Sequence, residues 1–356
     1  MPSSSSSPAS GSADRTGLVR AVLVEHELVL LLVAGYMLVA APLLGWGLHG
    51  DWQFRFGYTW LCGGWFAGSA IVLLAARLRG RLAEVLRGQV VAGALLVLAI
   101  AVPFQSTFNS VKQVMPRFVP FSWDKRLAAL DRTLHGGVDP WRFFAWILRE
   151  PLLLRTLDFV YILWFPLLVC VVVWCGWSSH RRLRARLLVA IVLAFFALGT
   201  VGAFAFSSAG PCYYGRVVSG PDPFAELVTA LDTRVDGDGM LLFAVENQRG
   251  LWEAWKQGRR HPFGGISAMP SMHVAMVVLV ALAAGAVDRR LGVAAWLFAL
   301  LTFVGSVALA WHYAVDGYVG GLAAAGLWVW IGRWRSIRTL PESLGAGLNT
   351  TRSLRS

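Results

Sequence analysis

Residues 187–206 read Leu-Leu-Val-Ala-Ile-Val-Leu-Ala-Phe-Phe-Ala-Leu-Gly-Thr-Val-Gly-Ala-Phe-Ala-Phe, a run without a single Asp, Glu, Lys or Arg. About 20 apolar residues cross the ~30 Å hydrocarbon core of a bilayer as an α-helix. This run is apolar throughout, whereas the strands of a membrane β-barrel alternate between apolar and polar residues. The stretch therefore predicts a transmembrane helix.

Similar runs recur along the chain and decide its fold class. Of the 356 residues, 56% are hydrophobic and 15% are charged, against about 25% charged residues in an ordinary soluble domain. This composition argues against two soluble domains, a secreted disulfide scaffold, a disordered regulator and a nucleic-acid-binding module. It predicts an all-α polytopic membrane protein, a bundle of about eight transmembrane helices, because in lipid the backbone must satisfy its own hydrogen bonds. The eight charge-free runs are Leu28–Leu48, Tyr58–Ala76, Gly88–Val111, Phe159–Ser179, Leu187–Gly215, Pro262–Val287, Leu291–Val315 and Gly317–Gly332.

Two connections, residues 112–158 and 216–261, are long and mixed in charge. We expect short interfacial helices in these two outer loops, because aromatic and arginine side chains on amphipathic helices suit the headgroup region of a bilayer. In the first loop, Leu127, Leu130 and Leu134 are spaced for one face of a short helix. Residues 207–216, Ser-Ser-Ala-Gly-Pro-Cys-Tyr-Tyr-Gly-Arg, suggest a turn folded back over a cavity.

The arginines predict the orientation of the bundle. The formal net charge is +12, and arginines gather at the ends of the apolar runs. Short cytoplasmic loops carry the excess of Lys and Arg in membrane proteins. We therefore expect a multi-pass protein of the plasma membrane with cytoplasmic N- and C-termini and both long loops outside. The arginines on which this orientation depends are Arg77, Arg79, Arg81, Arg87, Arg181, Arg182, Arg184, Arg186, Arg289, Arg290, Arg333, Arg335, Arg338, Arg352 and Arg355.

Three polar residues have unusually apolar neighbours. His273 lies in Ala268-Met-Pro-Ser-Met-His-Val-Ala275, at the start of the sixth span, and His312 and Asp316 lie where the seventh span ends and the eighth begins. Ionisable groups within a membrane span are costly and are candidates for a functional site. His312 and Asp316 are four residues apart, so on a helix they share one face. The topology brings all three residues to the outer membrane surface.

This trio favours displacement at phosphorus through a phosphohistidine. A carboxylate bonded to one imidazole nitrogen fixes the tautomer and leaves the other nitrogen as base or nucleophile. A second, protonated histidine can donate to a departing oxygen. The structural alternative is that His312 and Asp316 only satisfy each other between helices, while Ser271 caps the helix that carries His273.

The motifs resemble the type 2 phosphatidic acid phosphatase superfamily of membrane phosphoesterases. Its Pro-Ser-x-His motif is matched by Pro270-Ser-Met-His273, and its His-x-x-x-Asp motif by His312-Tyr-Ala-Val-Asp316. The apolar residue at 272, the His312-Tyr313 pair and Gly320-Gly321 are similar to the inositol phosphorylceramide synthase-like, inositolphosphotransferase branch. Further similarity to bacterial members of that branch lies in Trp123-Asp124, Leu130-Asp131, Gly136-Gly-Val-Asp-Pro140 and Asp158-x-x-Tyr161.

The resemblance implies a role for each motif residue. His312 would attack phosphorus, Asp316 would orient it, and His273 would protonate the leaving alkoxide and later deprotonate the acceptor. No cofactor and no metal are implied. The superfamily's first motif is absent, and Ser306 stands where its third motif has arginine. The phosphate still needs donors, and the candidates are Lys112, Arg216 and Ser271, with Arg259 and Arg260 as weaker ones.

We therefore expect a membrane phosphotransferase that moves a phospho-headgroup, such as phosphoinositol, from a phospholipid donor to a lipid alcohol acceptor, with its active site facing outward. One alternative is a lipid phosphate phosphatase that uses water as acceptor, and another is a proton-coupled transporter. The expected organisation is a disordered cytoplasmic tail (1–26), two accessory transmembrane helices (27–87), a catalytic bundle (88–335) and a second cytoplasmic tail (336–356).

Overall fold

The computed structural model describes residues 10–48, 58–262 and 264–340, and these residues form helices and loops without a strand. Within these residues, seven helical segments are long and apolar enough to cross a membrane, and a further apolar helix, α15 (Met272–Val287), is shorter. The predicted all-α polytopic fold is thereby confirmed. The seven segments are Glu25–Leu44, Thr59–Leu78, Gly88–Phe118, Pro151–Trp177, Arg181–Ala205, Arg289–Ala308 and Ala314–Ile331.

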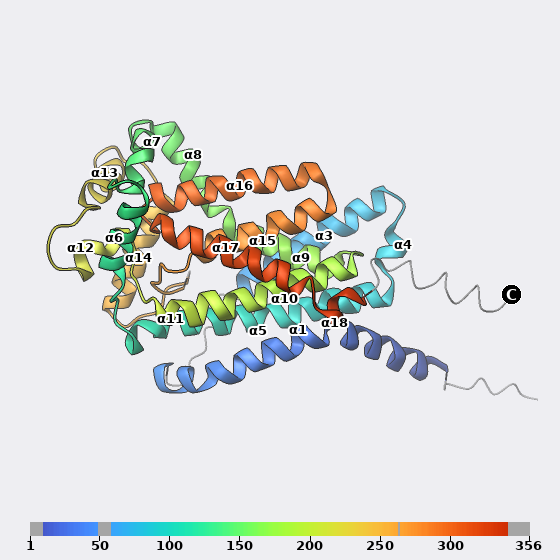
Figure 1. The fold of residues 1–356 in the computed structure, drawn as a ribbon. Helices are drawn as coiled ribbons and strands as arrows, with labels where there is room; N and C mark the ends of the chain where they lie inside the picture. Colours follow the sequence, from blue (N-terminus) through green and yellow to red (C-terminus); the bar gives the residue numbers. More distant parts are fainter. Residues whose placement is uncertain (1–9, 49–57, 263, 341–356) are drawn as a thin grey trace, which may run out of the picture.

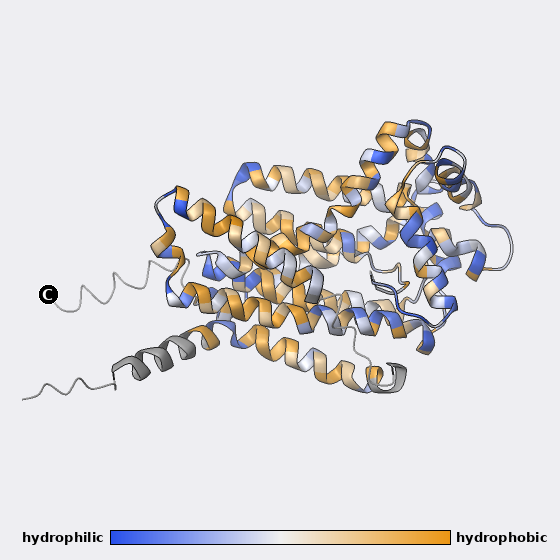
Figure 2. Cartoon of the chain, turned by 180° about the vertical axis from the view of Figure 1, so that it is seen from behind, coloured by the Kyte–Doolittle hydropathy of each residue, from blue (hydrophilic) through white to orange (hydrophobic). Residues whose placement is uncertain are grey.

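The long helices lie side by side and the short ones gather at the two ends of the bundle (Figure 1). One end carries the short helices of the two long loops, and the other carries α4 and α18. Hydrophobic residues predominate in the middle of the bundle, and hydrophilic residues are concentrated at its two ends (Figure 2). The long elements are α1 (Ser10–Leu48), η1 (Tyr58–Cys62) with α3 (Gly63–Leu78), α5 (Gly88–Phe118), α8 (Pro151–Ile162) with α9 (Trp164–Trp177), α10 (Arg181–Phe196) with η3 (Ala197–Gly202) and α11 (Ala203–Ala205), α16 (Arg289–Ala308) and α17 (Ala314–Ile331).

The expected short helices are present in both long loops. The first loop contains α6 (Asp124–Leu134), η2 (Pro140–Phe144) and α7 (Ala145–Arg149), and the second contains α12 (Tyr214–Val217, after η4, Pro211–Tyr213), α13 (Ala225–Asp236) and α14 (Phe243–Lys256). At the opposite end lie α4 (Leu82–Val85) and α18 (Arg335–Arg338).

Helix α15 lies at the centre of the bundle and contacts α9, α10, α16 and α17. Its residues Ala275, Met276 and Leu279 are completely buried. A helix that is apolar on every side is suited to burial among other helices. The helix begins ten residues later than the apolar run that predicted it, because Gly265 and Pro270 keep residues 264–271 in a loop.

The N-terminal helix is longer than the sequence indicated. We expected a disordered tail over residues 1–26, but α1 begins at Ser10; residues 1–9 lie outside the described residues, as do 341–356 of the predicted C-terminal tail. Glu25 makes ion pairs with Arg181 and Arg184 of α10. The carboxylate bridges two guanidinium groups of α10 at this helix contact, which stabilises α1 beyond the predicted apolar run.

The buried face of α6 differs from the predicted one. Leu127 is buried, but Leu130 and Leu134 are exposed, and the buried face also carries Asp124 and Asp131. These two aspartates are seven residues apart, which places them on one side of a helix. The leucine spacing failed as a guide because hydrogen bonds compensate the burial of the two carboxylates, as described below.

Candidate active site

His273 lies in the first turn of α15, at the end of the bundle that carries the long loops. The Ser271 hydroxyl caps this helix by accepting a hydrogen bond from the Val274 N–H at 3.4 Å. The imidazole of His273 packs between aromatic rings, with centroid distances of 4.4 Å to Trp164 and 4.9 Å to Tyr161. Aromatic walls on both sides restrict the orientation of this ring.

His312 and Asp316 interact, but not across one face of a helix as expected. His312 precedes α17, Tyr313 is the N-cap, and Asp316 lies in the first turn. Asp316 reaches back, so that its Oδ2 lies 3.3 Å from His312 Nδ1 and accepts a hydrogen bond from the Tyr313 N–H at 3.1 Å. The carboxylate thus satisfies an unpaired N–H at the helix start and orients the imidazole at the same time.

The two motifs meet through their backbones as well as through their side chains. The rings of His273 and His312 have centroids 5.8 Å apart. The Ser271 N–H donates a hydrogen bond to the Asp316 carbonyl at 3.0 Å. A Cβ on Gly320 would overlap the Ser271 carbonyl oxygen, so α17 approaches this loop as closely as a glycine permits. The convergence of the three residues expected from the sequence is therefore present.

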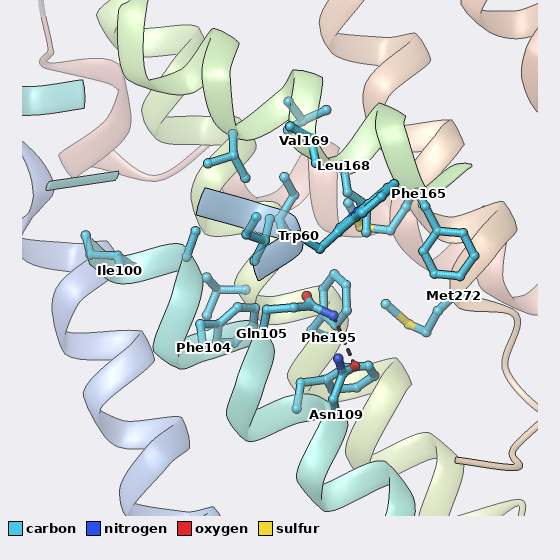
Figure 3. A pocket seen from close by; sticks show the side chains of 18 of the residues that line it. Trp60, Ile100, Phe104, Gln105, Asn109, Phe165, Leu168, Val169, Phe195 and Met272 are labelled. Atoms are coloured by element: carbon cyan, nitrogen blue, oxygen red, sulfur yellow. Dashed lines mark hydrogen bonds between the residues drawn. The ribbon is translucent and has the colours of Figure 1, made fainter. Parts of the chain in front are cut away.

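Two cavities meet at His273. One, of about 140 Å³, is lined mostly by apolar side chains of α5, α9, α10 and α15 and is named the apolar cavity here (Figure 3). The other, of about 80 Å³, is lined by both histidines and is named the two-histidine cavity. Lys112, Phe165 and His273 line both cavities. His312 lines the two-histidine cavity but not the apolar cavity.

The other predicted phosphate donors lie elsewhere. Arg216 is exposed, and its guanidinium packs over the ring of Trp252, 5.0 Å from the centroid. Ser271 is buried and its hydroxyl is occupied by the helix cap. Among the described residues that line the two cavities, neither Arg216 nor Ser271 is present, nor are Arg259 and Arg260. Lys112 is the predicted cation that the structure brings to the histidines.

Sequence reasoning missed two polar atoms in the two-histidine cavity. Tyr161 Oη and Trp311 Nε1 are buried and have no hydrogen-bond partner within residues 10–48, 58–262 and 264–340. Both side chains line this cavity, and each can donate one hydrogen bond to a bound oxygen. Tyr161 belongs to a segment that the sequence had singled out and Trp311 directly precedes His312, but neither was predicted as a hydrogen-bond donor.

The comparison with known families agrees with this geometry. A model of the PAP2 (type 2 phosphatidic acid phosphatase) superfamily matches residues 125–331, which contain both histidine motifs. The chain belongs to this superfamily. PAP2 proteins are phosphatases and phosphotransferases that act without a metal ion. No curated protein sequence and no solved structure gives a significant match. In the described part of the chain, no three His, Cys, Asp or Glu side chains form a group that could hold a metal ion.

The PAP2 core of this chain is held together by buried aspartates. Asp131 accepts hydrogen bonds from Ala314 N–H at 2.7 Å and Val315 N–H at 2.8 Å, the first two amides of α17. Asp124 accepts from Ala209 N–H at 2.9 Å and from the Tyr313 hydroxyl at 2.8 Å. The aspartates of α6 therefore hold the three residues that directly follow His312.

A third carboxylate repeats this arrangement in the second long loop. Asp158 of α8 accepts from Phe243 N–H at 2.7 Å and Ala244 N–H at 2.9 Å, at the start of α14. Asp158 and Ala244 both line the two-histidine cavity. The sequence marked Asp124, Asp131 and Asp158 only by family resemblance, and the structure assigns them the anchoring of loops that surround the site.

Burial shifts the pKa values of His312 and of the two aspartates of α6. Burial lowers the pKa of His312 to about 3, aided by the charge of Lys112 and opposed by a hydrogen bond with the Ala268 carbonyl. Burial also raises the pKa of Asp124 and Asp131, while the hydrogen bonds from the backbone act in the opposite direction. At neutral pH, His312 is therefore an uncharged imidazole with a lone pair available on one nitrogen.

Replacement of Asp131 by alanine is expected to destabilise the protein by about 3 kcal/mol, because two buried amides at the start of α17 lose their acceptor. The measurement is thermal unfolding of purified protein in detergent. Asp238→Ala is the matched control, since this aspartate forms an exposed ion pair with Arg234, and pairs of that kind contribute less than about 1 kcal/mol. Equal unfolding temperatures for the two variants would show that Asp131 is not an anchor.

Proposed function

We propose that this protein transfers a phosphoinositol headgroup from a phospholipid to a lipid alcohol through a phosphohistidine on His312. The observation that supports the proposal most strongly is the convergence of His273, His312 and Asp316 beside Lys112, with an apolar cavity on the His273 side. The superfamily accounts for the phosphoryl chemistry, and the similarity of residues 272, 312–313 and 320–321 to the inositolphosphotransferase branch supports the choice of headgroup.

The first half-reaction breaks the bond between phosphorus and the lipid oxygen of the donor. With Nδ1 of His312 protonated and directed at Asp316, the lone pair on Nε2 attacks phosphorus. Protonated His273 gives its proton to the departing lipid alkoxide, which leaves as an alcohol. The products are a neutral His273, a lipid alcohol and a headgroup phosphate bonded to His312.

The second half-reaction forms the new phosphoester. Neutral His273 removes the proton of an acceptor hydroxyl, whose oxygen attacks phosphorus and displaces His312. His273 is thereby protonated again and the enzyme returns to its starting state. In both steps the ammonium of Lys112 and the donors on Tyr161 and Trp311 would stabilise the negative charge on the phosphate oxygens, which is usually the largest contribution to catalysis.

The apolar lining beside His273 supports a lipid alcohol as acceptor. The group that His273 protonates in the first step and deprotonates in the second must lie on its side of the phosphorus atom. There the cavity is formed by side chains such as Phe104, Phe108 and Met272, which favour a hydrocarbon chain over water. Hydrolysis by the same residues is the competing reaction.

The test uses purified protein with phosphatidylinositol labelled in the inositol ring, with and without an acceptor, which is either ceramide or a diacylglycerol whose chains differ from those of the donor. Transfer predicts the label on a new lipid, dependent on the added alcohol. Release of water-soluble inositol phosphate as the main product in the presence of acceptor would identify a hydrolase instead. If the protein leaves phosphatidylinositol intact but acts on other phospholipids, the phosphoinositol assignment is wrong while the chemistry stands.

We also propose that the end of the bundle with the long loops faces outward. Ser219 is an exposed loop residue at that end, and Ser179 is an exposed residue in the turn before α10. In a variant without the native cysteines, Ser219→Cys is expected to react with a membrane-impermeant thiol reagent added to intact cells. Ser179→Cys is expected to react only after lysis, and the reverse pattern would contradict the orientation.

A further inference from the structure

One face of α5 carries a row of polar side chains into the apolar cavity. Gln105, Asn109 and Lys112 follow the i, i+4, i+7 spacing of one helix face, and all three line this cavity. Gln105 Nε2 donates a hydrogen bond to Asn109 Oδ1 at 3.2 Å. Figure 3 shows this pair among Trp60, Phe104, Phe195 and Met272.

The amide pair is only partly satisfied. An amide side chain has two N–H donors and two acceptor lone pairs. Within residues 10–48, 58–262 and 264–340, these two side chains hydrogen-bond only to each other. Gln105 therefore retains its carbonyl oxygen and one N–H, and Asn109 retains its whole NH₂ group. Polar groups in an apolar, membrane-embedded cavity are costly when unpaired, so their position favours a ligand with oxygen atoms at this depth.

The spacing along α5 matches the structure of a lipid that is held at its phosphate. Helix geometry places Asn109 about 4.5 Å and Gln105 about 10.5 Å from Lys112 along the axis. In a glycerolipid, ester carbonyls and any free hydroxyl lie a few covalent bonds from the phosphate, and the hydrocarbon begins just beyond them. A glycerolipid would match this order along α5. Its phosphate would lie at Lys112, its ester oxygens at Asn109 and Gln105, and its chains among the apolar side chains.

We propose that Gln105 and Asn109 hydrogen-bond the ester oxygens of the glycerolipid whose alcohol oxygen lies at His273, with its chains in the apolar cavity. This inference rests on the proposed function, because it needs a lipid alcohol that leaves or enters at His273. One general acid and base serves both half-reactions, so the departing and the entering alcohol occupy the same cavity in turn.

Part of the lining of this cavity belongs to residues that precede the region matched by the family model. Val29 of α1 and Trp60 and Leu61 of η1 line the apolar cavity, whereas the match begins at residue 125. The two accessory helices, to which the sequence assigned no role, thus close the part of the cavity that would hold hydrocarbon. The length of chain that fits depends on these residues.

The kinetic test compares a diacylglycerol, whose chains differ from those of the donor so that its product is distinguishable, with a dialkylglycerol of the same chain length, which has ether oxygens in place of ester carbonyls. Wild-type protein is expected to show a kcat/KM about fivefold to tenfold higher for the ester, the factor for one hydrogen bond of ~1–1.4 kcal/mol. Gln105→Leu and Asn109→Leu should reduce this ratio to about one, mainly through KM. Thr107→Val is the matched control, because the Thr107 hydroxyl is buried on α5 and bonded to the Pro103 carbonyl.

A second readout does not require turnover. A diacylglycerol with a photoactivatable diazirine in its chain is irradiated with purified protein, and the labelled peptides are mapped. Labelling on α5 and α9 residues of the apolar cavity is expected, with competition by unlabelled diacylglycerol. Labelling confined to the outer surface of the bundle would overturn the inference.

The two assays separate failure of this inference from failure of the proposed function. If wild-type protein transfers no headgroup but is labelled within the cavity, the proposed function fails and the lipid site stands. If transfer occurs and both leucine variants keep the ester preference, the amide pair does not recognise the lipid and this inference is wrong.

Discussion

Replacement of His312 by alanine is expected to lower the rate of the proposed headgroup transfer by at least about 10⁴-fold, since it removes the nitrogen proposed to form the covalent intermediate. The buried ring has a pKa held low by its surroundings, so in the wild-type protein the proposed nucleophile is a neutral imidazole in the physiological range. Quenching wild-type enzyme with labelled donor and no acceptor should trap label on His312 in an acid-labile bond. The rate and the trapped label are measured on the same preparations.

The controls distinguish loss of chemistry from loss of fold. His180→Ala removes an imidazole that is exposed just before α10, and it should leave the transfer rate unchanged. His312→Ala should elute as the wild-type protein does and bind phosphatidylinositol with similar affinity. An active His312→Ala variant would exclude a phosphohistidine at this position.

Asp316→Asn should lower the rate nearly as much while it changes the structure less. The asparagine oxygen can still accept the hydrogen bond from the Tyr313 N–H, and the main-chain carbonyl that accepts from Ser271 N–H is unchanged. The neutral amide cannot stabilise the positive charge that the imidazole acquires when it attacks phosphorus. Activity equal to wild type would show that Asp316 only caps α17.

The fold class and the central trio could be predicted from the sequence because both depend on local composition. Charge-free runs of about 20 residues predict transmembrane helices directly. Histidines within such runs are conspicuous because their neighbours are apolar. The helix limits were less certain at the site itself. The charge-free run that begins at Pro262 suggests a helix from its start, but the hydrogen bonds of Ala268 and Met269 with Ser208 hold residues 264–271 as a loop.

The supporting residues of the site could not be found from local pattern. Asp124 and Asp131 look like surface residues of an amphipathic helix, and their partners are amides more than 80 residues away in the chain. The same holds for the choice among the candidate cations. From the sequence, Lys112 and Arg216 were equal candidates, and Arg259 and Arg260 were weaker ones. The tertiary packing places Lys112 beside His273.

Gly320→Ala is expected to reduce the transfer rate by about 100-fold and to destabilise the protein by about 1–3 kcal/mol, whereas the neighbouring Gly321→Ala should have little effect. A methyl group on Gly320 would overlap the Ser271 carbonyl oxygen, which is main chain and cannot rotate away. At Gly321 the nearest atom is a side-chain methyl of Val274 at 3.5 Å, an ordinary contact. Alanine at 321 can even stabilise α17, because it is the better helix former.

This pair of adjacent glycines tests whether the distance between the motifs controls the chemistry. Relief of the overlap at residue 320 must move α17 away from Ser271, and Asp316 and His312 move with it. The rate should then fall more than lipid binding, because Lys112 and the apolar cavity lie on α5 and α9, away from the displaced helix. Transfer rates and unfolding temperatures of both variants decide the matter. Equal rates for Gly320→Ala and Gly321→Ala would mean that the close contact of the two backbones does not set the position of the histidines.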